Sequence, residues 1–269
     1  MKIVSILVLF FVTFNAARVD SRPNPDDRLR HLFVFGDSFG DNGNTRQPLV
    51  DVVLGTDKVN QDTRQWFFPY GSFTDGREHP TGRFSNYMVQ SDLVANIMGL
   101  AVAPPAYKLT KKNTWDKSGM TFAVGGTNVF QAPTSNKAVP TLRDQVDRLE
   151  SLIVDGTISR KHNRDLKRQL RAMDDVHIID LHTAFTNIVE GENTEVSSFF
   201  DERLAPCCKS TDPSGYCGQM GDSDSDFRYT LCKNADKYFY WDEMNPTQAG
   251  WEIVMEQLED PIKKFLELN

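Results

Sequence analysis

The chain has 269 residues, of which 39% are hydrophobic and 25% are charged, so it can form one large domain or two small ones and is not a disordered chain or a coiled coil. Thirty Lys and Arg residues against 37 Asp and Glu residues give a net charge of −7. A mildly acidic surface gains nothing from the release of counterions from nucleic acid, so no nucleic-acid partner is expected.

The N-terminus has the pattern of a secretory signal peptide. Lys2 precedes an apolar stretch over residues 3–14, and small residues follow at Ala16, Ala17 and Ser21. We therefore expect residues 1–21 to be a leader outside the fold and residues 22–269 to form a single secreted domain. An N-terminal membrane anchor is the alternative, but the apolar stretch is too short to cross a bilayer core of about 30 Å, so no stable membrane insertion is predicted.

Buried strands and amphipathic helices alternate along the rest of the chain. Strands are predicted over 32–35, 122–126 and 176–181, and helices over 85–99 with Ser85 as the cap, 141–156 with Thr141 and Asp144 as a capping box, 160–171, and a last segment that contains Trp251, Val254, Met255 and Leu258. This alternation favours an α/β fold of three layers around a largely parallel sheet.

Four cysteines lie close together near the C-terminal end, and the rest of the chain has none. They are Cys207, Cys208, Cys217 and Cys232. Adjacent cysteines rarely bond to each other, so each of the first two is expected to pair with one of the last two, in either combination. A zinc site is the rival interpretation, but the pattern has no C-x-x-C and no nearby histidine. We predict two disulfides that hold a surface loop.

A serine follows the first buried strand in a segment rich in turn-forming residues. Gly36, Asp37 and Ser38 come directly after the strand, and the carboxyl ends of strands are where open α/β sheets carry their sites. Alone, such a tripeptide is more often an ordinary turn between a strand and a helix.

Four separate sequence blocks, in one order across most of the chain, indicate that this serine belongs to a larger pattern. They are Phe35-Gly36-Asp37-Ser38-Phe39-Gly40-Asp41-Asn42-Gly43-Asn44, Pro80-Thr81-Gly82-Arg83-Phe84-Ser85-Asn86, Phe122-Ala123-Val124-Gly125-Gly126-Thr127 and Tyr240-Trp241-Asp242-Glu243-Met244-Asn245-Pro246-Thr247. Together they resemble the plant GDSL-type esterases and lipases of the SGNH hydrolase superfamily. The paired cysteines and Phe239-Tyr240-Trp241-Asp242 resemble one clade of it.

The resemblance implies a flavodoxin-like sheet, secretion, no metal or cofactor, and hydrolysis of small acyl-ester or acetylated-sugar substrates by a Ser-His-Asp triad. Ser38 matches the nucleophile and Asp242 the acid that orients the histidine. The backbone N–H groups of Ser38 and of Gly126, or of Gly125 beside it, match two oxyanion donors. In such a triad the imidazole takes the serine proton, and the donors stabilise the negative oxygen that forms.

The chain departs from the family pattern at two places. Asn245 stands where the family has its histidine, and an amide does not accept a proton near neutral pH. The Gly-x-Asn-Asp block, whose asparagine is the third oxyanion donor, is absent, as if central strands and helices had been deleted near residues 159–163. The sheet is therefore expected to be incomplete in its centre.

Another histidine is the remaining source of a base. The chain has His31, His79, His162, His177 and His182. Of these we rank His182 first, because it follows the predicted strand over 176–181, but triad geometry tolerates little displacement.

Three functions fit these residues. The first is an ester hydrolase with weak or no activity. The second is a secreted binding protein in which loop aromatics such as Trp66, Phe67, Phe68 and Tyr70 contact a sugar or an acyl group, although packing onto the sheet is the commoner role of such side chains. The third is the product of a truncated gene. No oligomeric state is predicted.

Overall fold

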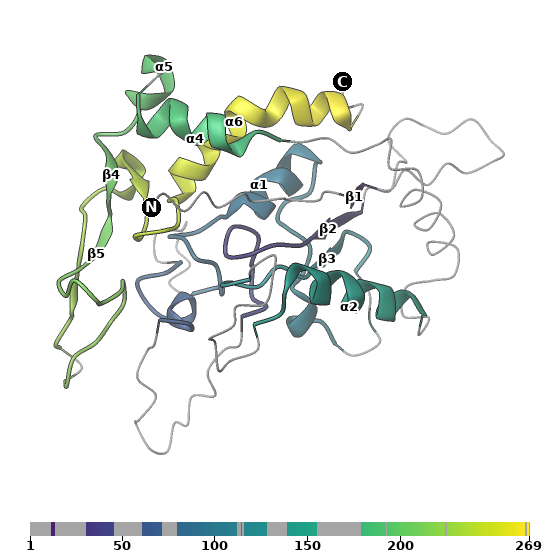
Figure 1. The fold of residues 1–269 in the computed structure, drawn as a ribbon, viewed down its shortest axis with the longest axis horizontal. Coiled ribbons are helices and arrows are strands. Elements are labelled where there is room, and N and C mark those ends of the chain that lie inside the picture. Colours follow the sequence, from purple (N-terminus) through teal and green to yellow (C-terminus); the bar gives the residue numbers. More distant parts are fainter. Residues whose placement is uncertain are drawn as a thin grey trace.

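The computed structural model describes residues 12–13, 31–45, 61–71, 80–111, 114, 116–127, 139–154, 179–191, 193–223, 225–266 and 268. These residues form a mixed α/β structure, as predicted (Figure 1). A sheet with the order β1-β2-β3 is built from Val12–Thr13, Leu32–Val34 and Gly119–Thr121. Strands β2 and β3 are parallel, with Phe33 opposite Met120.

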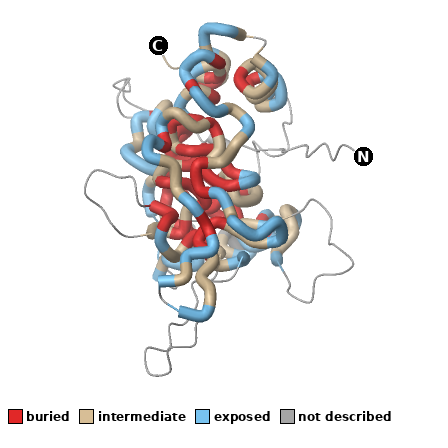
Figure 2. The backbone as a smooth tube through the Cα atoms, turned by 90° about the vertical axis from the view of Figure 1, so that its left-hand side faces the viewer, coloured by how far each residue is buried: buried red, intermediate tan, exposed pale blue. Residues whose placement is uncertain are grey.

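The side chains of β2 point alternately to the two faces of the sheet and pack with helices on both faces, which gives three layers. Successive side chains of a strand point to opposite faces, and Leu32 and Val34 pack with helices α1 and α6 while Phe33 packs with helix α2. Figure 1 shows α6 and α2 on opposite sides of β2 and β3. All three β2 residues are buried, and buried residues fill the middle of the molecule in Figure 2.

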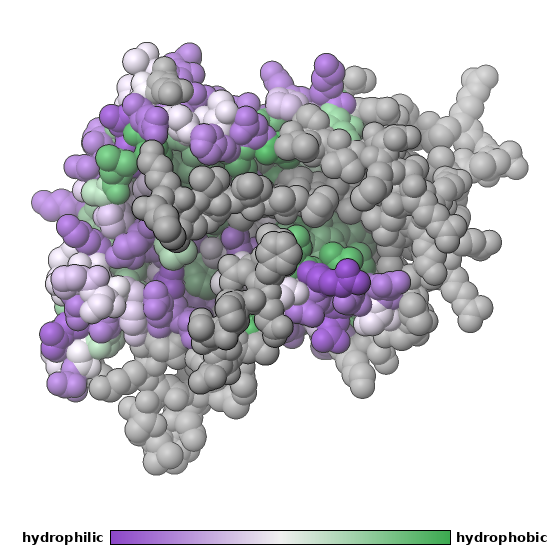
Figure 3. Space-filling view, viewed as in Figure 1, coloured by the Kyte–Doolittle hydropathy of each residue, from purple (hydrophilic) through white to green (hydrophobic). Residues whose placement is uncertain are grey.

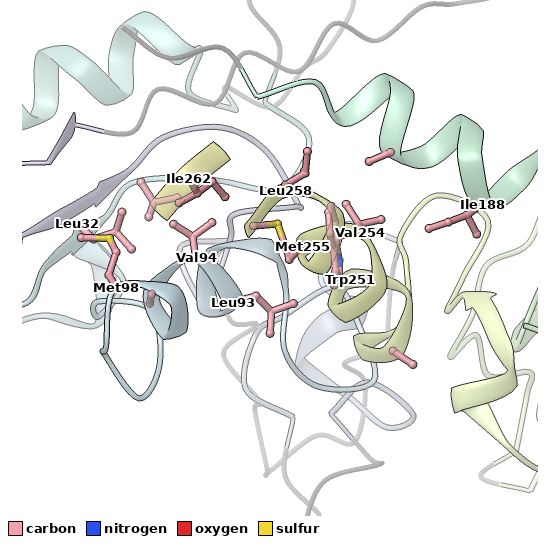
Figure 4. Close-up of a cluster of buried hydrophobic side chains, with 14 of the residues drawn as sticks. Leu32, Leu93, Val94, Met98, Ile188, Trp251, Val254, Met255, Leu258 and Ile262 are labelled. Carbon is pink, nitrogen blue, oxygen red and sulfur yellow. The ribbon is translucent and has the colours of Figure 1, made fainter. Parts of the chain in front are cut away.

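The larger core cluster joins β2 to helices α1 (Gln90–Ile97), α4 (Leu181–Val189) and α6 (Gln248–Phe265). Leu93 and Val94 of α1 lie in the same cluster as Met255 of α6, as the close-up in Figure 4 shows. The predicted inward face of the last helix is confirmed, because Trp251, Val254, Met255 and Leu258 are all buried. This packing attaches the C-terminal helix to the sheet that carries the serine turn.

Helix α2 (Leu142–Val154) covers the other face of the sheet. Leu149 packs there with Phe33 and Met120. The predicted capping box is present, since the backbone N–H of Thr141 donates to the Asp144 carboxylate and the backbone N–H of Asp144 donates to the Thr141 hydroxyl. Hydrophilic side chains gather over the outer side of α2 (Figure 3).

The cysteine segment forms a separate small cluster. Two short sheets, β4–β7 (Glu202–Pro206 with Tyr238–Tyr240) and β5–β6 (Cys208–Ser210 with Tyr229–Leu231), surround disulfides Cys207–Cys232 and Cys208–Cys217. The structure therefore confirms two disulfides and excludes the zinc interpretation. Helix α5 (Thr194–Ser197) and short 3₁₀ helices at Arg64–Trp66, Tyr107–Leu109 and Ala235–Lys237 complete the described elements.

Three element predictions need correction. Helix α1 begins at Gln90 rather than after Ser85, because the Ser85 hydroxyl donates to the carbonyl of Pro246 and takes part in a long-range contact instead of a cap. Leu181 begins helix α4, where Asp180 is the N-cap, so the strand predicted over 176–181 is wrong from residue 179 onward. Strand β3 lies just before the predicted 122–126, although the N–H of Phe122 still donates to the carbonyl of Val34.

Other expectations lie outside the described residues or differ from the structure. The helix predicted over 160–171 and the junction near 159–163 are outside the described residues. The leader was expected to lie outside the fold, yet Val12 and Thr13 pair antiparallel with β2. The edge of β2 opposite β3 offers backbone groups to any extended segment, which is the physical reason for this pairing. Within the described residues, no helix has both the length and the apolar composition needed to cross a membrane.

Candidate active site

Ser38 lies in a tight turn at the carboxyl end of β2, as predicted. The N–H groups of Gly40 and Asp41 both donate to the carbonyl of Asp37, which closes the turn. Gln145 of α2 holds the start of the turn, because its side chain both accepts from the N–H and donates to the carbonyl of Gly36. Ser38 is half-buried, and in the described part of the chain no group hydrogen-bonds to its hydroxyl.

Asp41 connects the serine turn to the loop after β3. One carboxylate oxygen accepts from the N–H groups of Gly43 and Asn44, and the other accepts from Thr45 and, at 2.7 Å, from the N–H of Gly125. Burial raises the pKa of Asp41, and these hydrogen bonds lower it in part. The carboxylate thus positions two of the predicted blocks against each other.

The Asp41 contact distinguishes the two glycines proposed as oxyanion donors. The N–H of Gly125 is occupied by Asp41 and also reaches the hydroxyl of Thr45 at 3.1 Å. This contact argues against Gly125 as an oxyanion donor, and the role predicted for Gly126 stays a prediction. The φ of Gly126, 83°, lies in the left-handed region that favours glycine, and the nearest atom to a Cβ there would be Val139 Cγ1 at 4.0 Å.

Asp242 is completely buried, and protein groups donate to both of its carboxylate oxygens. Its Oδ2 accepts from the Tyr70 hydroxyl at 2.7 Å and pairs with Arg64 Nη2 at 3.3 Å. Its Oδ1 accepts from the backbone N–H groups of Met244 at 2.9 Å and Asn245 at 2.8 Å. The carboxylate therefore already has the hydrogen bonds and the counter-charge that a buried anion requires.

Asn245 occupies the position beside Asp242 that the resemblance assigns to histidine. Its Nδ2 donates to both Asp242 oxygens, at 2.9 and 3.1 Å. The residue is buried, and its Oδ1 has no hydrogen-bond partner among the described residues. The amide thus reproduces the donor function of an imidazole toward the acid, but it has no nitrogen that can accept the serine proton.

Arg64 and Tyr70 belong to the aromatic loop; no role was predicted for Arg64, and Tyr70 was considered only as a ring that contacts a ligand or packs onto the sheet. Arg64 Nε donates to the Tyr70 hydroxyl at 2.7 Å, and both side chains are buried. Burial and the neighbouring Asp242 raise the pKa of Tyr70 well above 10.0, so the phenol stays a neutral donor. The separation of 178 residues between Arg64 and Asp242 explains why no local pattern indicated the contact.

Phe84 connects the serine side of the site with the Asp242 side. Its ring packs directly on Gly125, where a Cβ would come within 2.4 Å of it, and the Arg64 guanidinium carbon lies 5.3 Å from its centre. The structure thus brings Asp242 and Asn245 together and joins Ser38 to them through intermediate residues. It records no direct hydrogen bond from Ser38 to either residue in the described part.

Neither of the histidines in the described part offers a base to Ser38. His31 is buried, and its Nδ1 is bonded to the carbonyl of Lys117. His182, which we ranked first, lies exposed in the first turn of α4 rather than after a strand. His79, His162 and His177 lie outside the described residues.

The aromatic loop packs mainly onto the protein itself. Tyr70 is fully buried, and Trp66 lies over Gly43 and Gly82 while its Nε1 donates to the carbonyl of Thr45. Phe68 is 56% exposed. Packing therefore accounts for most of this segment, and Phe68 is the member whose ring is available at the surface.

Comparison with known proteins shows that the chain is similar to plant GDSL esterase/lipases. No protein-family model matches the chain. The GDSL esterase/lipases At5g03600 and At5g03590 of Arabidopsis thaliana are 23% and 24% identical to it, over 89% and 99% of the chain and 96% and 98% of their own lengths. At1g28570 from the same organism is 34% identical over 131 residues, which are 49% of the chain and 30% of that protein. The alignments with the first two extend over 337 and 367 residues, so both relatives carry residues that this shorter chain lacks.

Proposed function

The chain belongs to the plant GDSL esterase/lipase family, and on this premise we propose that it is a secreted, catalytically silent member of the family. Ser38 occupies the nucleophile position, Asp242 the position of the acid and Gly126 that of an oxyanion donor. The substrate class that the framework addresses is a small acyl ester or an acetylated sugar. The apolar stretch over residues 3–14 and the two disulfides support secretion, because disulfides persist in oxidising compartments.

One observation carries the proposal: the amide of Asn245 donates to Asp242 where an imidazole would be needed. A serine hydroxyl is a poor nucleophile until a base removes its proton. Removal of a triad member costs about 10⁴- to 10⁶-fold in rate in serine hydrolases. Without the base, Ser38 is expected to lack most of the rate enhancement that a complete triad supplies.

The missing Gly-x-Asn-Asp block strengthens the proposal. Loss of one oxyanion donor costs a further factor of about 10² to 10³ where the effects are independent. The length of the alignments with the two Arabidopsis relatives supports an internal shortening of this chain. Two separate contributions to transition-state stabilisation are therefore reduced.

Hydrolysis of an activated ester tests the proposal. Purified protein is mixed with p-nitrophenyl acetate, and both the burst and the steady rate of p-nitrophenol release are compared with those of Ser38→Ala. We expect no burst and equal rates for the two proteins. A burst stoichiometric with enzyme that Ser38→Ala abolishes would refute catalytic silence.

A further inference from the structure

Arg64 is placed where it affects the chemistry of Asp242 and not only its solvation. Its Nη2 lies 3.3 Å from Asp242 Oδ2, and its Nε donates to Tyr70, which donates to the same oxygen. The Arg64 side chain is 10% exposed and that of Asp242 is not exposed at all. The charge pair is thus buried, and screening by solvent and salt is weak at a buried site.

The acid of a triad acts through its negative charge. It orients the imidazole and stabilises the imidazolium that forms when the serine proton is transferred. A guanidinium in contact with the same carboxylate neutralises that charge and repels a second cation within about 4 to 6 Å. An imidazolium beside Asp242 would therefore lose much of its stabilisation.

We propose that Arg64 is a positioning residue that holds Asp242 as a structural counterion, so that a second block on triad chemistry exists besides the missing histidine. The inference rests on the proposed function, because it concerns the same site. It predicts that an imidazole restored at position 245 has no strongly anionic partner while Arg64 is present.

The surroundings of Asp242 allow this effect to be assigned to Arg64. Tyr70 is neutral, and the Tyr216 phenol lies near enough to Arg64 to feel its charge while its own pKa is raised by burial. Glu243 is exposed and its carboxylate faces the N–H of Ser210. Arg64 is therefore the cation in direct contact with the Asp242 carboxylate in the described part of the chain.

The test measures the pKa of the introduced imidazole by NMR titration in the full chain carrying Asn245→His. Three backgrounds are compared: unchanged Arg64, Arg64→Lys, which keeps the positive charge, and Arg64→Gln, which removes it but can still hydrogen-bond to Tyr70. We expect a pKa at or below the ordinary value of about 6.5 with Arg64 or Lys. With Gln we expect it to rise by about 1 or more, which is a tenfold gain in proton affinity.

Equal pKa values in the three backgrounds would overturn the inference. Tyr70→Phe, which removes a hydrogen bond without changing charge, provides a second comparison in case Arg64→Gln does not fold. In that case Tyr70→Phe should leave the imidazole pKa nearly unchanged, and Arg64→Lys should keep it low. A raised pKa already present with Arg64 intact would also contradict the inference. These readouts concern proton affinity in variants, so they stay separate from the ester hydrolysis by the unmodified chain that decides catalytic silence.

Discussion

At the scale of single residues, Arg64 and Asp242 form a buried ion pair in the candidate site. Both charges are withdrawn from water, and each depends on the other for compensation. Removing one partner leaves the other charge buried and unpaired. The pair therefore ties the loop around Arg64 to the turn at 241–245 near the end of the chain.

Asp242→Asn should reduce the free energy of unfolding by about 3 to 5 kcal/mol, because the buried Arg64 loses its counterion. Urea unfolding at neutral pH measures this loss. Asp226→Asn is the matched control, since the Asp226–Arg228 pair is exposed and should contribute about 1 kcal/mol or less. Equal losses of stability in the two variants would show that burial does not increase the contribution of the Asp242 pair to the free energy of unfolding.

The contact of Asn245 with Asp242 could be predicted from the sequence, whereas the contact of Arg64 with Asp242 could not. Asn245 lies three positions after Asp242, so a local motif places the two together. Arg64 contacts the same carboxylate although it lies 178 residues away in the sequence, and no periodicity or spacing predicts such a contact. Asp41 is similar, because its bond to Gly125 spans 84 residues. The chemistry of the site was therefore predictable, and its electrostatic environment was not.

At the scale of elements, the pairing of β2 with β3 places the serine turn next to the Gly125–Gly126 loop. Gly119 makes the pairing possible: its φ is 123°, and a Cβ would lie 1.9 Å from the carbonyl oxygen of Leu32. This contact is with backbone, which cannot move aside as a flexible side chain would. Position 119 therefore requires glycine for both conformational and steric reasons.

Gly119→Ala should destabilise the protein by more than about 3 kcal/mol, because steric overlap with β2 adds to backbone strain of about 1 to 2 kcal/mol. Gly99→Ala separates the two contributions, since Gly99 also has a positive φ of 82° but has nothing within 4 Å of a Cβ. The loss of stability in Gly99→Ala should equal the backbone strain alone. Denaturant unfolding of both variants checks this, and a loss at 119 no larger than at 99 would contradict the steric argument.

Helical periodicity predicted the inward faces of α2 and α6 correctly, whereas two of the local cap and strand signals were misleading. The apolar faces of α2 and α6 depend on side chains three or four residues apart, which the sequence displays directly. Ser85 has the residue type of a cap, yet its hydroxyl bonds to Pro246 on a distant segment. Apolar residues such as Ile179 and Leu181 suit a strand and a helix equally, and the Asp180 cap with its Thr183 contact determines the helix.

At the scale of the whole molecule, the layers and the disulfides follow from composition and pattern, while the completeness of the sheet does not. Helices on both faces of β2 and β3 reproduce the predicted three-layer arrangement. The neighbour of β2 on its other edge is β1, Val12–Thr13, within the segment expected to be a leader. Which segment fills an open edge depends on long-range competition between strands, and local patterns carry no information about it.

The measurement that tests the account most directly is labelling of Ser38 by a fluorophosphonate, read as a mass shift of the intact protein. The sample is first shown to unfold cooperatively by circular dichroism, so that a negative result comes from folded chain. The account predicts no mass shift, because an unactivated hydroxyl does not attack the phosphorus centre. A stoichiometric adduct that Ser38→Ala abolishes would contradict it.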